Sequence, residues 1–204
     1  MTEEQIDMEL IREAGKIIRD GGLVAFPTET VYGLGGDALN PLSSRKIYAA
    51  KGRPSDNPLI VHIADQQALS SIVGEIPGNA WKLAERFWPG PLTMILHKSD
   101  RVPRETTGGL ETVAVRMPAN RIAQEMIRAA GGYVAAPSAN RSGRPSPTVA
   151  RYVAEDLAGR VEMIIDGGDV EIGLESTIVD LTSDRPMVLR PGYITRQDLE
   201  NVLS

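Results

Sequence analysis

Cationic side chains stand at places in this sequence where an apolar strand or a helix ends. Lys51 and Arg53 follow a helical stretch, Arg116 ends the apolar run Val113-Ala114-Val115, and Arg190 precedes Pro191-Gly192. Arginine grips phosphate or carboxylate oxygens with a planar pair of donors, and lysine adds a point charge. Each also has an ordinary structural interpretation, because cations are favoured at helix C-termini and at strand rims. The residue types indicate anion binding without proving it.

Small and hydroxylic residues form a second group. Thr30 and Tyr32 lie in a run, residues 27–35, where an apolar stretch gives way to hydroxyls and glycines. Ser138 and Asn140 lie in Pro137-Ser138-Ala139-Asn140, and Ser176 lies in Glu175-Ser176-Thr177-Ile178-Val179-Asp180. Glycine lets the backbone approach a ligand closely. An ordinary turn or a polar strand edge explains each run as well, and none has the Gly-Lys-Ser/Thr spacing of a P-loop.

The histidine and cysteine content limits the kinds of active site that the chain can form. The chain has no cysteine and two histidines, which excludes disulfides, thiolate metal sites, a cysteine nucleophile and a multi-histidine zinc site. His62 lies inside the apolar run Leu59-Ile60-Val61-His62-Ile63. A lone histidine in a strand is more often a satisfied structural residue than a ligand.

The charge is unevenly distributed. The chain holds 22 basic and 27 acidic residues, a net charge of −5, which argues against a general nucleic-acid coat. Residues 42–64 carry four bases and one acid, and residues 133–154 carry three arginines and no acid, whereas residues 155–184 carry nine acids and one base. A phosphate-bearing ligand would favour the first two segments.

The elements that must position these residues alternate irregularly between helix and strand. Thr2 and Gln5 predict a capping box for the first helix, Asn40-Pro41 opens another, and Thr195 with Asp198 opens the last. Helices are predicted near residues 6–18, 41–50, 66–72, 79–87, 119–130, 148–157 and after 195. Strands are predicted near residues 23–26, 59–63, 92–96, 112–116, 133–136, 162–165, 176–181 and 187–190. Residues 28–36 are predicted as a loop. The fold class is therefore mixed α/β, an open twisted mixed sheet flanked by helices.

Length and termini set the remaining expectations. A chain of 204 residues favours one compact domain over residues 1–204. The start, Met1-Thr2-Glu3-Glu4, is acidic and unlike a signal or transit peptide, and no apolar run approaches the roughly 20 residues of a membrane span. A cytoplasmic location is the default expectation.

The motifs taken together are more specific than any one of them. The threonine-rich loop, Lys-x-Arg-Pro with Asn-Pro, Ser-Ala-Asn, Ser-Thr-Ile-Val-Asp and Arg-Pro-Gly occur in this order. In this the chain closely resembles the YrdC-like family of threonylcarbamoyl-AMP synthases, from about residue 7 to residue 203, in its single-domain form. The resemblance implies an open sheet with a large, concave, positively charged cavity.

The resemblance also implies an activity. Such proteins condense L-threonine, bicarbonate and ATP to threonylcarbamoyl-AMP and pyrophosphate, which serves formation of N6-threonylcarbamoyladenosine at position 37 of tRNA. The implied cofactors are ATP, as a substrate, and Mg²⁺ carried on its triphosphate rather than by a protein metal site. The implied partners are the three small substrates and downstream tRNA-modification proteins, with tRNA contact left open and no membrane.

Site residues follow from the resemblance position by position. Lys51 and Arg53 are expected to bind the triphosphate and to be catalytic, and Arg116 to clamp the threonine carboxylate. The remaining ATP-side residues are expected to be Asn57, Asn140 and Arg190, with Thr112, Ser146 and Thr148 as weaker candidates. The remaining threonine-side residues are expected to be Thr30, Tyr32, His62, Ser138 and Ser176. Replacing Lys51 or Arg53 by alanine is expected to lower turnover with little effect on folding, since their loop is expected to be exposed.

Two alternatives stay open at this point. One is an RNA-binding module that uses the concave surface, although the net charge and only nine aromatic residues argue against strong general RNA binding. The other is a paralogue that keeps the fold and acts on another carbamoyl or acyl adenylate. Omitting threonine separates the cases, because the synthase should then release no pyrophosphate.

Overall fold

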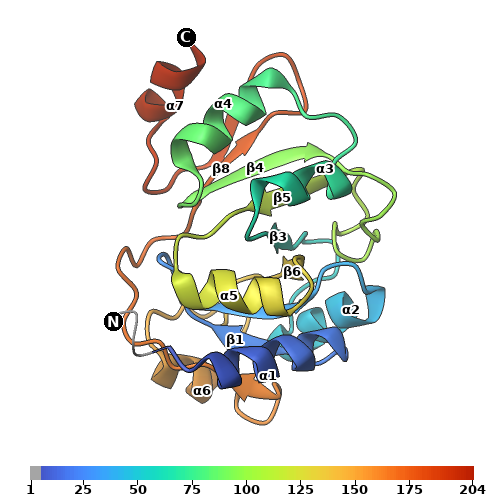
Figure 1. The fold of residues 1–204 in the computed structure, drawn as a ribbon, viewed down its shortest axis with the longest axis vertical. Coiled ribbons are helices and arrows are strands. Elements are labelled where there is room, and N and C mark those ends of the chain that lie inside the picture. Colours follow the sequence, from blue (N-terminus) through green and yellow to red (C-terminus); the bar gives the residue numbers. More distant parts are fainter. Residues whose placement is uncertain (1–5) are drawn as a thin grey trace.

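A computed structural model describes residues 6–204. Its centre is a nine-stranded mixed sheet in the order β7-β1-β2-β6-β3-β5-β4-β8-β9, which confirms the predicted fold class (Figure 1). The strands are β1 Val24–Phe26, β2 Gly33–Asp37, β3 Ile60–His62, β4 Leu92–His97, β5 Thr112–Arg116, β6 Val134–Ala135, β7 Met163–Ile164, β8 Thr177–Asp180 and β9 Met187–Arg190. The helices are α1 Met8–Arg19, α2 Pro41–Lys51, η2 Gln66–Ala68, α3 Leu69–Ile72, α4 Gly78–Phe87, α5 Arg121–Ala129, α6 Ala150–Leu157 and α7 Arg196–Leu203.

The helices cover the sheet differently at its two ends. Near β1, alternate side chains point to opposite faces: Val24 and Phe26 pack with α1 and α5, while Ala25 belongs to the core that contains α2 and α6. Near β4, Leu92 and Met94 join the core that contains α3 and α4. Figure 1 shows α4 and α7 with β4 and β8 at one end, and α1, α2, α5 and α6 around β1 at the other.

The first helix differs at its start from the sequence prediction. The predicted capping box, Thr2 with Gln5, lies outside the described residues. In the described part α1 begins at Met8, and the Asp7 side chain accepts hydrogen bonds from the N–H groups of Glu9 and Leu10 at 2.9 and 3.2 Å. Asp7 is thus the N-cap. The predicted caps of the other two helices, Asn40-Pro41 at α2 and the Thr195–Asp198 capping box at α7, are confirmed.

The prediction of a loop over residues 28–36 is wrong in its second half, because residues 33–37 form β2. This strand pairs with β1 through its first residues and with β6 through its last. Glycine has low strand propensity, which is why the run Gly-Leu-Gly-Gly did not indicate a strand. Here the missing side chain is required: a Cβ on Gly35 would lie 2.9 Å from both Phe26 and Val134. The close packing of neighbours on β2 therefore selects glycine.

The segment 165–176 crosses most of the molecule. It leaves β7 at one edge of the sheet and enters β8, and six strands lie between these two. Seven strand spacings amount to about 34 Å, and the segment's residues 165–176 reach about 40 Å when fully extended. It is held by the loop after β1, because Ile172 and Gly173 donate their N–H groups to the carbonyls of Glu29 and Thr30 at 2.9 and 3.0 Å.

Within residues 6–204, no helix combines the length and apolarity that crossing a bilayer requires.

Candidate functional site

A hollow of about 320 Å³ lies over the face of β3, β5, β4 and β8 opposite to α3 and α4. Strand alternation decides which side chains face it. The residues of these four strands that line it are Ile60, His62, Ala114, Arg116, Ile95 and Ile178. His62 is directly opposite Arg116 in register, and Arg116 is opposite Thr93, so polar side chains form a row across the sheet.

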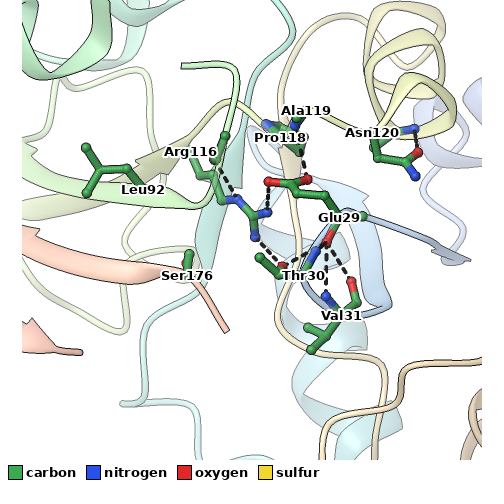
Figure 2. Close-up of polar contacts among 12 residues, drawn as sticks. Glu29, Thr30, Val31, Leu92, Arg116, Pro118, Ala119, Asn120 and Ser176 are labelled. Carbon is green, nitrogen blue, oxygen red and sulfur yellow. Dashed lines mark hydrogen bonds and ion pairs between the residues drawn. The ribbon is translucent and has the colours of Figure 1, made fainter. Parts of the chain in front are cut away.

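Arg116 is the most buried of the three arginines that line the hollow. Its Nη2 donates to Glu29 Oε1 at 2.5 Å, its Nη1 to Thr30 Oγ1 at 2.9 Å, and its Nε to the Gly90 carbonyl at 3.3 Å. The other oxygen of Glu29 accepts the N–H of Ala119 at 3.0 Å. Figure 2 shows Glu29 between Arg116 and the Pro118–Ala119 segment. The guanidinium is held by acceptors from two separate parts of the chain, residues 29–30 and Gly90.

The hydroxyls beside Arg116 have a defined direction of donation. Thr28 Oγ1 donates its single hydrogen to the Val31 carbonyl at 2.7 Å and lies 2.9 Å from Thr30 Oγ1. Thr30 must therefore donate to Thr28 while accepting from Arg116. The loop after β1 is consequently rigid where it meets the hollow, and both threonines line it.

His62 is neutral and its tautomer follows from its contact. Its Nδ1 lies 3.1 Å from the Ile60 carbonyl, which can only accept, so Nδ1 carries the proton. Burial, and secondly the positive charge of Arg116, lowers the pKa of His62 from 6.5 to about 3. Nε2 is left as a hydrogen-bond acceptor in the wall of the hollow.

Arg53 contributes a second cation from the loop after α2. Its Nε and Nη2 donate to Asn57, at 3.1 Å to the carbonyl and 2.7 Å to Oδ1, and Nη2 also donates to the Pro58 carbonyl at 2.9 Å. Within residues 6–204 no partner is found for its Nη1. Burial lowers the pKa of Arg53 from its usual value, but an arginine stays charged. Asn57, which the sequence predicts as an ATP-side residue, also lines the hollow.

Arg190, the last residue of β9, is the third cation that lines the hollow. Its Nη1 pairs with Glu175, its Nε donates to the Ser176 carbonyl at 3.1 Å, and its Nη2 to Ser176 Oγ at 3.2 Å. Ser176 Oγ is also 2.8 Å from Thr93 Oγ1. Glu175 accepts a further hydrogen bond from Ser146 Oγ at 2.7 Å. The Glu175 carboxylate thus engages Nη1 of Arg190, and Ser176 engages its Nε and Nη2.

Lys51 is not the exposed loop cation that the sequence predicted. It is the last residue of α2 and is 2 % exposed. Its Nζ donates to the carbonyls of Ser138 and Asn140, the latter at 2.6 Å, and lies 3.4 Å from Asn140 Oδ1. Burial, and secondly the charge of Arg53, lowers its pKa from 10.5 to about 8. Lys51 fixes the Ser138–Asn140 loop, of which Ser138 lines the hollow.

Five other predicted residues lie outside the wall of the hollow. Asn140 turns into its own loop, where Nδ2 donates to the Arg141 and Arg144 carbonyls at 3.0 and 2.7 Å. Tyr32 is buried, and its hydroxyl donates to the Gly168 carbonyl at 2.8 Å. Ser146 reaches the hollow only through Glu175, and the Thr148 carbonyl accepts the N–H of Val170 at 3.1 Å.

Thr112, a further residue predicted on the ATP side, is not among the residues that line the hollow. It starts β5, four residues before Arg116, and is opposite His97 at the other end of the strand pair. Eight of the predicted residues do line one hollow, and they are Thr30, Arg53, Asn57, His62, Arg116, Ser138, Ser176 and Arg190.

Two carboxylates that matter for the site carried no predicted role. Glu29 and Glu175 stand inside the motifs that the sequence singled out, but their partners Arg116 and Arg190 are distant in the chain. Glu29 lies three residues after the buried strand β1, and an acid that is buried there needs a cation or several donors; this was the signal in the sequence.

The hollow carries three arginines, one carboxylate, one neutral histidine and several hydroxyls. This composition suits the binding of a small anionic ligand on the face of an open mixed sheet. A family model described as telomere recombination, the Sua5, YciO and YrdC group, matches residues 16–192. The chain belongs to this family.

Relatives of known name agree with the family. Threonylcarbamoyl-AMP synthase of Pyrococcus abyssi is 56% identical over 202 residues, which is 99% of this chain and 59% of that protein. The enzyme of the same name from Bacillus subtilis is 54% identical over 194 residues, 95% of this chain and 56% of that protein. The chain therefore spans less than two thirds of the length of these two relatives.

Solved structures give the same result for the fold. The crystal structure of Pyrococcus abyssi Sua5 in complex with L-threonine superposes with a TM-score of 0.96 at 56% identity, covering 98% of this chain and 59% of that one. Escherichia coli YciO superposes with a TM-score of 0.83 at 28% identity, covering 92% of this chain and 91% of that one. The YrdC-like fold expected from the sequence is confirmed.

Proposed function

We propose that this chain is a threonylcarbamoyl-AMP synthase that condenses L-threonine, bicarbonate and ATP, with release of pyrophosphate. The observation that carries the proposal is the hollow itself, where Arg53, Arg116 and Arg190 converge beside Thr30, His62 and Ser176. Support also comes from the two relatives named as synthases and from the related structure that holds L-threonine.

The reaction suits a site without a protein nucleophile. The threonine amine attacks bicarbonate and water leaves, which gives a carbamate; a carbamate oxygen then attacks the α-phosphorus of ATP, and pyrophosphate leaves. The protein has to align two anions and offset their repulsion. Arg116 is proposed to bind the amino-acid carboxylate, and Arg53 and Arg190 the phosphates.

Neutral His62 is suited to the amino-acid side of this site. Its Nε2 can accept a hydrogen bond from a ligand amine or hydroxyl, but it cannot add a positive charge. Lys51 and Asn140 are proposed to act on the ATP side by shaping the loop that presents Ser138 rather than by lining the hollow.

Mg²⁺ is expected to arrive with ATP and to offset charge on the triphosphate. The described residues suit a Mg²⁺ ion held mainly by the triphosphate, because the wall of the hollow offers one carboxylate, Glu175. Within residues 6–204 no group of three or more His, Cys, Asp or Glu side chains is arranged to hold a metal. We also propose that the product is used in tRNA modification, that the protein is cytoplasmic, and that residues 1–204 form a single domain.

The proposal is tested by incubating the chain with ATP, L-threonine, bicarbonate and Mg²⁺ and analysing the products by mass spectrometry. A mixed anhydride of threonylcarbamate and AMP, with matching pyrophosphate, is expected. Pyrophosphate release that persists without threonine would indicate a paralogue acting on another acid. Salt-dependent retention of RNA without ATP turnover would indicate an RNA-binding module instead.

A further inference from the structure

Glu29 and Arg116 form an ion pair at the back of the hollow. Their side chains are 6% and 5% exposed. Arg116 lines the hollow, whereas Glu29 is not part of its wall and contacts Arg116 from behind. A buried arginine needs a compensating charge, and Glu29 supplies it.

The contacts of Glu29 fix the guanidinium in place. One carboxylate oxygen accepts from Arg116 and the other from the N–H of Ala119, two residues before α5. Glu29 itself follows β1, and the 165–176 segment holds its carbonyl through the N–H of Ile172. The carboxylate therefore has both oxygens engaged on groups from different elements (Figure 2). It has little freedom to follow a moving arginine.

The contacts of Arg116 leave part of its guanidinium available to a ligand. A guanidinium has five N–H groups. Three are engaged, by Glu29, Thr30 and the Gly90 carbonyl. Among the described residues, one N–H on Nη1 and one on Nη2 find no partner. In a bidentate pair a carboxylate takes one N–H from each of two guanidinium nitrogens, and the pair is lost when the plane turns.

We propose that Glu29 is a positioning residue for amino-acid recognition, which holds the Arg116 guanidinium so that its two remaining N–H groups meet the substrate carboxylate. This inference rests on the proposed function, because that function supplies an amino-acid substrate. Glu29 acts through Arg116 and does not touch the ligand.

Positioning and charge compensation predict opposite effects. If Glu29 only balanced the charge of Arg116, its neutralisation would leave an uncompensated cation and strengthen the binding of an anion. If Glu29 orients Arg116, its neutralisation weakens binding. Glutamine cannot replace it, because an amide that accepts from Arg116 turns its NH₂ group toward the N–H of Ala119.

Two variants separate these cases. Glu29→Gln removes the charge and keeps the size, whereas Glu29→Asp keeps the charge and loses one methylene of reach. Both are expected to raise the Kd for L-threonine, measured by titration calorimetry, about tenfold, the equivalent of one charge-assisted hydrogen bond. The matched control is Glu105→Gln, which removes a carboxylate paired with Arg45 at 2.8 Å outside the hollow, and it is expected to bind as the wild type does.

Further readouts exclude a general structural defect. The KM for ATP should stay within twofold of wild type in both variants while the KM for threonine rises. Binding of 1-amino-2-propanol, which lacks the carboxylate, should be equal in all forms. Folding is checked by thermal melting, and Glu29→Asp decides the matter if Glu29→Gln does not fold.

The outcomes are distinct. Unchanged or tighter threonine binding in the folded variants overturns the positioning role and leaves the synthase proposal standing. Wild-type chain that binds threonine but forms no adenylate overturns the synthase proposal, and the binding data still decide the role of Glu29. Wild-type chain that does not bind threonine overturns both.

Discussion

At the scale of single residues, the site depends on how each cation is compensated. Arg116 is balanced by Glu29 and Arg190 by Glu175, whereas Lys51 donates only to oxygens without a formal charge, on Ser138 and Asn140. Arg53 makes hydrogen bonds to Asn57 and Pro58 that carry no formal charge. Because their environments differ, the four cations contribute differently to folding and to ligand binding, although the sequence pattern around each of them looks similar.

Lys51 and Arg53 should therefore respond differently to replacement by alanine. Lys51→Ala leaves two buried carbonyls without a donor and is expected to lower the free energy of unfolding by about 1–3 kcal/mol as well as turnover. Arg53→Ala is expected to raise the KM for ATP about tenfold or more with little loss of stability. Urea denaturation and pyrophosphate release, measured on both variants, check this. Equal stability of the two would contradict the distinction.

His62 makes the folded state sensitive to acid. The unfolded chain takes up a proton at this residue near pH 6.5, but the folded chain only near pH 3, so stability falls as the pH drops through this interval. The loss between pH 7.5 and 5 is expected to be about 2 kcal/mol. His62→Asn should lack this part of the acid sensitivity in urea denaturation at pH 7.5 and 5, and the exposed His97→Asn should keep it. Parallel slopes for all three proteins would contradict the prediction.

Much of this residue-scale picture could be predicted from residue types, and part could not. Cations and hydroxyls at strand ends pointed to an anion site, and eight of the predicted residues line the hollow. The pairing of Glu29 with Arg116 could not be predicted, because it depends on which strands are neighbours in space. The burial of Lys51 escaped prediction for the same reason, since its partners lie 87 and 89 positions away.

At the scale of elements, glycine decides how closely two elements approach. Helices α1 and α5 cross at Gly15, where a Cβ would lie 2.5 Å from the backbone carbon of Ala129. Gly35 in β2 has the same role beside Phe26. The helices were predictable from apolar periodicity and caps, but β2 was not, because its glycines are selected by packing rather than by strand propensity.

Gly15→Ala is accordingly expected to destabilise the chain by about 1–3 kcal/mol, because backbone atoms cannot move aside as a side chain can. The matched control is Gly78→Ala at the start of α4, where a Cβ would meet nothing within 4 Å. Its stability should equal or exceed that of the wild type. Thermal and urea denaturation of both variants test this, and a Gly15→Ala protein as stable as Gly78→Ala would refute it.

At the scale of the molecule, one sheet and a shared core join the two ends. Ala25 and Leu34 at one end belong to the same buried cluster as Leu92 and Met94 at the other. The open mixed sheet was predictable from the irregular alternation of elements. The strand order was not, because nothing in the local pattern of β8 indicates that it inserts beside β4.

The continuous core leads us to expect that the whole chain unfolds in one transition. Tryptophan fluorescence, which comes from Trp81 in α4 and the buried Trp88 directly after it, should report the same urea midpoint as far-UV circular dichroism, which reports all helices and strands. Two separate midpoints would show that the ends of the sheet are independent and would contradict a single domain.

The long 165–176 segment has a consequence for a nascent chain on the ribosome. Strand β4, residues 92–97, has β5 on one side, and its other neighbour β8 is translated about 80 residues later. Until residues 177–180 emerge, the backbone edge of an apolar strand stays open to pairing with any extended polypeptide. We therefore expect truncated translation products that stop before β8 to aggregate or to be captured by chaperones, whereas products released after β9 escape both.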